Sequence, residues 1–79
     1  MKANTVLRHK KNGHIVVFKC MVNSREFRTV DDFQFLLSDF EEIEQPTIEQ
    51  KEQALRNINF FVGSLTDEAI EYYYNKLIA

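Results

Sequence analysis

The dipeptide Asn12-Gly13 constrains the fold most, because it stands between two stretches in which apolar and polar residues alternate. Both central residues of a type I′ turn need positive φ, and Asn-Gly is the preferred sequence for such a hairpin turn. A second tight turn is expected at Asn23-Ser24. The first thirty residues are therefore predicted to form three antiparallel strands, with residues 14–22 as the central one.

Alternation along these strands sorts the side chains onto two faces of the predicted sheet. One face is apolar and is expected to be the core face; it carries Leu7, Val16, Phe18, Cys20, Val22 and Phe27. The opposite face has cations above an apolar floor. The cations are Arg8, Lys10, Lys19 and Arg28, and the floor is Val6, Ile15, Val17 and Met21. The two turns place Leu7 opposite Phe18 and Lys19 opposite Arg28.

After Val30 the spacing of apolar residues becomes helical. Three helices are predicted, and they begin after the N-caps Thr29, Thr47 and Thr66. The first ends at Gln45-Pro46, and the second at Gly63-Ser64. The chain is thus predicted to be a single α+β domain, residues 1–79, in which a three-stranded antiparallel meander (1–30) precedes three helices (31–79) packed on its core face.

Charge divides the chain at the same point. Residues 1–30 carry seven cations and one acid, a net charge of +6, whereas residues 31–79 carry three cations and eleven acids, a net charge of −8. The two halves either neutralise each other in the fold or present separate surfaces to partners. No apolar run approaches the ~20 residues of a membrane span, so we expect a cytoplasmic protein without a membrane partner.

The sequence offers little for catalysis or metal binding. Cys20 is the only thiol and falls on the predicted core face, and the two histidines, His9 and His14, are too few ligands for a zinc site. No glycine-rich phosphate loop or nucleophile motif occurs. We therefore predict no enzymatic activity, no metal site and no cofactor.

Surplus aromatic residues mark the first candidate surface. Tyr72, Tyr73 and Tyr74 cannot all enter one core, because successive helical residues point about 100° apart. Tyr73 lies on the apolar stripe, which leaves Tyr72 and Tyr74, and Phe35 and Phe60 also fall outside their stripes. All four are predicted interface residues, unless small helices simply need wide apolar faces. Homodimerisation would be the simplest such interface.

Two charged surfaces are further candidates. An acidic stretch would either mimic a phosphate backbone or form a solvated surface; it comprises Asp39, Glu41, Glu42, Glu44, Glu49 and Glu52. The basic sheet face would contact nucleic acid through Arg8, Lys10, Lys19 and Arg28. Its aliphatic floor cannot stack bases, however, which counts against this role.

The favoured interpretation is a small non-enzymatic binding module that acts on another protein as an inhibitor, adaptor or regulator. The alternative is a nucleic-acid binder that uses the basic sheet face. Thirty of the 79 residues are Phe, Tyr, Met, Ile, Asn or Lys, as expected of AT-rich coding. Small proteins of this composition without motifs are common in phages and mobile elements, and we expect such an origin.

Overall fold

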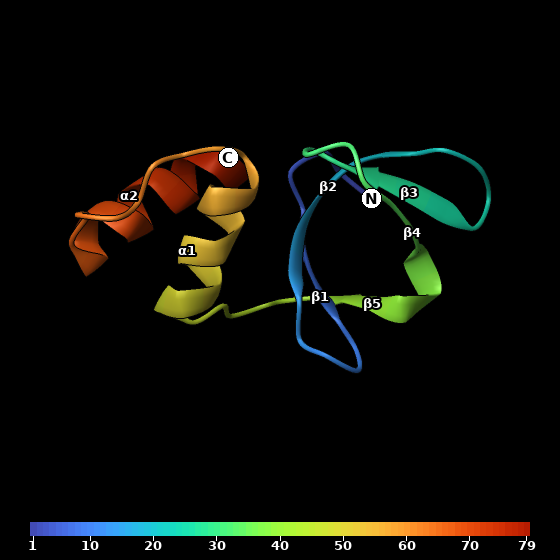
Figure 1. Ribbon diagram of the computed structural model, residues 1–79, viewed down its shortest axis with the longest axis horizontal. Coiled ribbons are helices and arrows are strands. Elements are labelled where there is room, and N and C mark those ends of the chain that lie inside the picture. Colours follow the sequence, from blue (N-terminus) through green and yellow to red (C-terminus); the bar gives the residue numbers. More distant parts are fainter.

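Five antiparallel strands and two α-helices make up the computed structural model, which describes residues 1–79 (Figure 1). The strands are β1 (Val6–His9), β2 (Ile15–Met21), β3 (Glu26–Thr29), β4 (Gln34–Leu36) and β5 (Phe40–Glu42), and a 3₁₀ turn, η1 (Leu37–Asp39), joins the last two. The helices are α1 (Ile48–Asn57) and α2 (Asp67–Ile78). The α+β class is as predicted, but the three-stranded meander with three helices is wrong.

The largest error concerns the predicted first helix, residues 30–45, which contains β4, η1 and β5 instead. Thr29 does not cap a helix: its buried hydroxyl accepts a hydrogen bond from the Phe33 backbone N–H at 3.0 Å. This closes a turn in which Asp32 has a φ of 67°. Pairing of β5 with β1 then outweighs local helix propensity.

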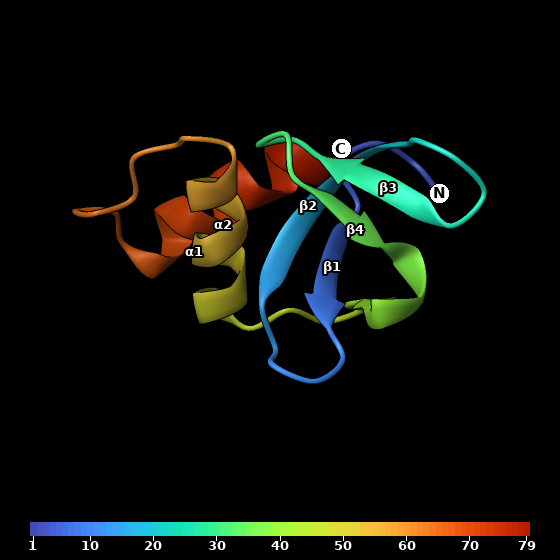
Figure 2. The same cartoon turned by 45° about the vertical axis from the view of Figure 1, so that its right-hand side comes forward.

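The sheet curls on itself, because its edge strands are only three residues apart in sequence. The strand order is β4-β3-β2-β1-β5, and η1 alone connects β4 to β5 (Figure 2). The interior of this curl, the barrel core, consists of Leu7, Val16, Phe18, Phe27 and Phe40. Four of these residues were predicted for the core face; the curl of the sheet, not a helix, covers them.

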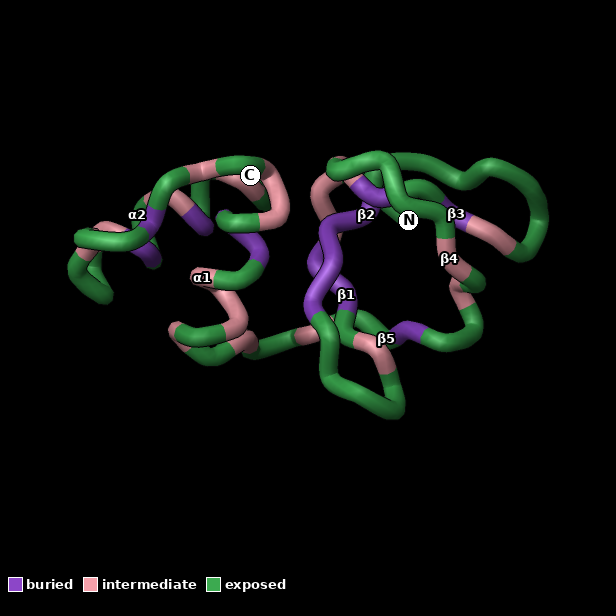
Figure 3. The backbone as a smooth tube through the Cα atoms, viewed as in Figure 1, coloured by how far each residue is buried: buried purple, intermediate pink, exposed green.

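The helices pack on the opposite face of the sheet, which corrects the predicted arrangement. Val6, Ile15 and Val17, the supposed floor of the basic face, lie in a second core with Ala54 of α1 and Tyr74 of α2. The Asn57 side-chain amide also donates a hydrogen bond to the Ile15 carbonyl at 2.5 Å. Buried residues accordingly follow β1 and β2, which form a wall between the two cores (Figure 3).

The first turn is longer than predicted. His9 N–H donates to the His14 carbonyl at 2.8 Å, and Gly13, with a φ of 74°, donates to the His9 carbonyl at 3.0 Å. A four-residue loop therefore replaces the two-residue turn, and Leu7 lies opposite Val16. A shift of two residues returns every side chain to the same face, so the sorting of β1 and β2 survives the error.

The second hairpin contains an irregularity that the alternation argument missed. The register of β2 against β3 shifts between Phe18 and Cys20. Arg28 lies opposite Cys20 rather than Lys19. The shift turns Cys20 and Val22 outward, so both are exposed and the predicted core position of Cys20 is wrong.

The two remaining helices begin where predicted. Thr47 and Gln50 form a reciprocal capping box at α1, and the Thr66 hydroxyl accepts from Ala69 N–H at α2. However, α1 ends at Asn57, well before Gly63, because Asn59 adopts a left-handed φ of 62°. Phe60 N–H then donates to the Leu55 carbonyl at 3.0 Å, as in a Schellman motif. Neither helix has the length and apolar composition needed to cross a bilayer.

Candidate binding surfaces

The structure separates the four aromatic interface candidates. Phe35 points into the barrel core, with its ring centroid 6.1 Å from that of Phe27 and 5.3 Å from that of Phe40. Tyr74 is 4% exposed and packs between α2 and the sheet. Phe60, like Phe35, is half-buried and packs against a core, and only Tyr72 is exposed. Tyr74 was predicted as an interface residue, but Tyr74 and Ile70, four residues apart, are the buried residues of α2.

Burial of Tyr74 has a measurable consequence at high pH. Desolvation raises the pKa of its hydroxyl above the ordinary value of 10.0. Between the unfolded and folded pKa values the native state holds the extra proton, so stability is lost as the pH rises above 10. We expect Tyr74→Phe to reduce this loss, measured by urea unfolding at pH values on both sides of 10. Lys76, whose pKa is also raised, is present in the native protein and in the Tyr74→Phe variant, so it does not affect the comparison. An unchanged pH dependence in the variant would contradict the assignment.

Phe60, Tyr72 and Tyr73 form a continuous row of rings on the helical hairpin. Phe61 follows Phe60 in the α1–α2 loop, and we call these four residues the aromatic surface. The Phe60 and Tyr73 ring centroids are 4.6 Å apart, and those of Tyr73 and Tyr72 are 5.2 Å apart. Tyr72 is 55% exposed and Phe61 79% exposed. The α1–α2 loop runs from the end of α1 that faces the sheet to the end of the molecule remote from the sheet (Figure 1).

A cation borders the aromatic surface. Lys76 Nζ lies 4.8 Å from the centroid of the Tyr72 ring, one helical turn away on α2. Hydrogen bonding to Tyr72 raises the pKa of Lys76, so its ammonium group stays charged at neutral pH. The row of rings therefore ends in a fixed positive charge, which gives the surface a polar rim beside its apolar centre.

Sequence reasoning missed Phe61, because it extended α1 as far as Gly63 and placed Phe61 on the apolar face of that helix. The structure ends α1 earlier and leaves Phe61 in the loop. A Cβ atom on Gly63 would lie 3.0 Å from the Phe61 ring, so glycine lets the ring rest against the backbone. Asn59, a residue that tolerates the left-handed region, was the available signal for the early helix end.

The acidic candidates do not form one surface. Asp39, Glu41 and Glu42 lie on η1 and β5, Glu44 follows β5, and Glu49 and Glu52 lie on α1. Two of them have cationic partners. Arg8 Nε donates to Glu41 Oε1 at 3.1 Å, and Arg56 pairs with Glu52 at 2.5 Å. Because β5 lies beside β1, part of the acidic segment neutralises the basic hairpin.

The basic sheet face is not an open surface either, because the helices cover its apolar floor. Of its four cations, Arg8 pairs with Glu41, and Lys19 lies 3.8 Å from Asp32. Arg28 lies on β3 between Cys20 and Gln34 of the neighbouring strands. Lys10 lies in the β1–β2 turn and borders a pocket instead.

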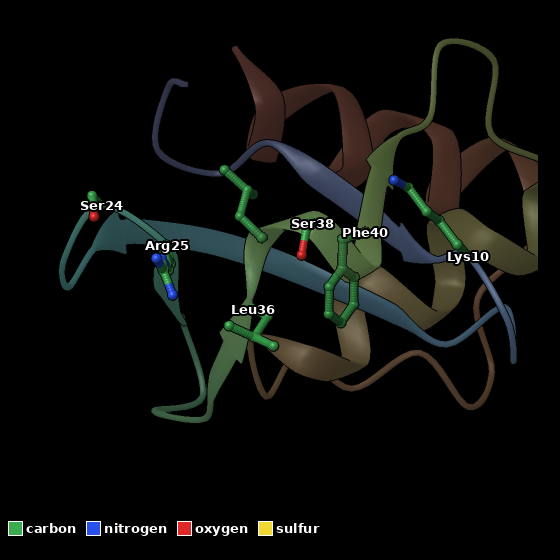
Figure 4. A pocket seen from close by; sticks show the side chains of 7 residues that line it. Lys10, Ser24, Arg25, Leu36, Ser38 and Phe40 are labelled. Carbon is green, nitrogen blue, oxygen red and sulfur yellow. The ribbon is translucent and has the colours of Figure 1, made fainter.

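That pocket has a volume of 670 Å³ and lies where two turns meet the β4–η1–β5 connection (Figure 4). In the close-up, Lys10 and Arg25 stand on opposite sides, with Ser38 and Phe40 between them. Its lining comprises Lys10, Ser24, Arg25, Leu36, Leu37, Ser38 and Phe40. No three His, Cys, Asp or Glu side chains come together anywhere in the structure to hold a metal ion.

The fold and these surfaces define a small α+β domain in which a curled five-stranded sheet carries a helical hairpin with exposed aromatic residues. The chain matches no protein-family model, and comparisons with curated proteins and with solved structures find no similar protein.

Proposed function

We propose that the chain is a small non-enzymatic module that binds another protein through the aromatic surface, as an inhibitor, adaptor or regulator. The observation that carries the proposal is the row of rings from Phe60 through Tyr73 to the exposed Tyr72. Aromatic residues dominate the energetics of protein interfaces, and exposed groups of them mark interaction sites.

The hairpin core accounts for the buried members of this row but not for the exposed ones. Leu55, Val62 and Ile70 form that core, with Phe60 and Tyr73 packed against it. Tyr72 and Phe61 do not belong to it. The half-buried rings hold the exposed Tyr72 in place, which lowers the entropy lost when a partner covers it.

Origin and compartment are part of the same proposal. The AT-rich composition supports a phage or mobile-element source. The exposed free thiol of Cys20 suits a reducing compartment, and we infer that the protein acts in the cytoplasm. Nothing in the structure favours nucleic-acid binding through the basic sheet face, since its floor is covered by α1 and α2.

Site-specific photo-crosslinking in an extract of the native host tests the proposal. A photoreactive phenylalanine analogue at position 61 is expected to capture a partner, whereas the same group at position 19, an exposed position on β2, is not. Tyr72→Ala should weaken this association by about 1–3 kcal/mol. Phe33→Ala, which removes a 60% exposed ring from the sheet side, is the matched control and should have no effect.

The outcomes distinguish the candidate partners. A crosslinked product of twice the mass of the chain would identify the partner as a second copy, which would make the aromatic surface a homodimer interface. Absence of a product, equal capture from both positions, or capture that persists in Tyr72→Ala would contradict the proposal.

A further inference from the structure

The pocket beside the β4–η1–β5 connection, described above, holds two cations that lack acidic partners. Lys10 comes from the β1–β2 turn and Arg25 from the β2–β3 turn, and both are exposed. The four ion pairs of the molecule involve other residues: Arg8–Glu41, Lys19–Asp32, Lys51–Glu71 and Arg56–Glu52. Two separate turns thus bring two available positive charges to the opposite sides of one depression (Figure 4).

The nearest acids along the chain do not neutralise these cations. Glu26 follows Arg25, but its carboxylate accepts hydrogen bonds from the Asn23 amide at 3.0 Å and the Gln34 amide at 3.2 Å. These bonds lower the pKa of Glu26, and its carboxylate forms no ion pair with Arg25. The carbonyl of Asp39 accepts a bond from Lys10 N–H at 2.9 Å, yet no ion pair joins the two side chains. Lys10 and Arg25 therefore form no ion pair and place a positive charge on each side of the pocket.

The floor of the pocket is apolar. Leu36 is 45% exposed, Leu37 is half-buried, and Phe40 is only 6% exposed. Because the Phe40 ring is covered, the floor offers no open aromatic face on which a base would stack. The volume of 670 Å³ falls within the usual range of ligand pockets and suits an apolar side chain together with its neighbours.

One side of the pocket is also the free edge of the sheet. β4 pairs only with β3. Thr29 N–H donates to the Phe33 carbonyl at 2.8 Å, and Leu37 N–H donates to the Arg25 carbonyl at 2.9 Å. Because inward and outward backbone groups alternate along an antiparallel strand, those of Gln34 and Leu36 face the open edge. An extended peptide can pair with such an edge.

We propose that this pocket binds a short acidic peptide segment of a partner protein, in extended form along β4. An apolar side chain of the segment packs on Leu36 and Leu37, above the nearly buried Phe40, and flanking carboxylates pair with Lys10 and Arg25. The pocket is built from the sheet and its turns, whereas the aromatic surface belongs to the helical hairpin, so this second site goes beyond the function proposed above.

Selection from a random displayed library of short peptides on the intact protein tests the proposal. Enriched peptides are expected to carry acidic residues on both sides of an apolar residue. The most enriched peptide is then synthesised and its affinity measured by fluorescence anisotropy. The Lys10→Gln/Arg25→Gln double variant should bind it about a hundredfold more weakly, roughly tenfold for each lost charge pair. Added salt should weaken binding to the native protein.

Two controls make the result specific. Lys2→Gln/Arg56→Gln removes one lysine and one arginine elsewhere in the chain and should leave peptide affinity unchanged. Tyr72→Ala should do the same, which separates this site from the aromatic surface. Circular dichroism checks that each variant is folded. The proposal is overturned if no peptide is enriched, if the enriched peptides show no acidic preference, or if they bind the double variant as tightly as the native protein.

Discussion

Replacing Phe27 with alanine is expected to remove about 3–5 kcal/mol of folding free energy, the usual effect of deleting a buried aromatic ring. Phe27 is fully buried, and its ring centroid lies 5.6 Å from that of Phe18 and 5.3 Å from that of Phe40. A chain of this length has a total stability of about 4–12 kcal/mol. Urea denaturation followed by circular dichroism should therefore show a variant that has lost a large part of its stability.

Phe27→Leu keeps the measurement possible if the alanine variant does not fold, because it removes less volume. Phe61→Ala is the matched control, since it deletes the same ring from a side chain that is 79% exposed, and it should change stability by less than about 0.5 kcal/mol. Equal losses from Phe27→Ala and Phe61→Ala would contradict the assignment of the barrel core.

Replacing Ile15 with alanine is expected to cost about 2–5 kcal/mol, because Ile15 is 2% exposed between β2 and the helices. Met21 lies on the same strand but is 41% exposed, so Met21→Ala is the control. Chemical denaturation of both variants measures which face of the sheet the helices cover.

The same pair of variants bears on function. If the face that carries Ile15 were an open basic surface, its truncation would change stability as little as Met21→Ala does. If Ile15→Ala lowers the folding free energy by less than about 1 kcal/mol, the helices do not cover this face. The basic sheet face would then be open to solvent, as nucleic-acid binding requires.

Sequence patterns predicted correctly those parts of the fold that depend on residues close together in the chain. The caps at Thr47 and Thr66 depend on side-chain hydroxyls next to free N–H groups, and both helices begin there. The sorting of Leu7, Val16 and Phe18 onto one face depends only on strand periodicity, and it holds. These features need no knowledge of distant residues.

The segment 30–45 could not be predicted in the same way. Its apolar spacing fits a helix, and only the pairing of Phe40 with His9, 31 positions earlier in the chain, makes a strand of it. Once that strand closes the curl, the first core needs no helix, and the helices are free to cover the other face. One misread segment therefore explains the wrong strand number, the wrong helix number and the wrong packing face.

The candidate surfaces also divide into features that depend on nearby residues and features that depend on the rest of the fold. Tyr72 was singled out because helical geometry leaves it off the apolar stripe of α2. Phe60 was singled out by the same argument, although α1 ends at Asn57 and Phe60 lies in the loop. Phe61 was missed because a single left-handed residue, Asn59, ended α1 early. The pocket between Lys10 and Arg25 was invisible to sequence reasoning, since its floor belongs to residues that were expected to be helical.

Because β1 and β2 lie between the two cores, the two cores form at different times during synthesis. Every residue of the barrel core precedes residue 43, so the curled sheet has all its partners before α1 leaves the ribosome. Val6, Ile15 and Val17 are covered later, because Ala54 and Tyr74, which pack on them, come later in the chain. Until then a nascent chain presents these three apolar side chains uncovered on a sheet whose strands are already paired. This interval is when the protein is most exposed to aggregation and to capture by chaperones.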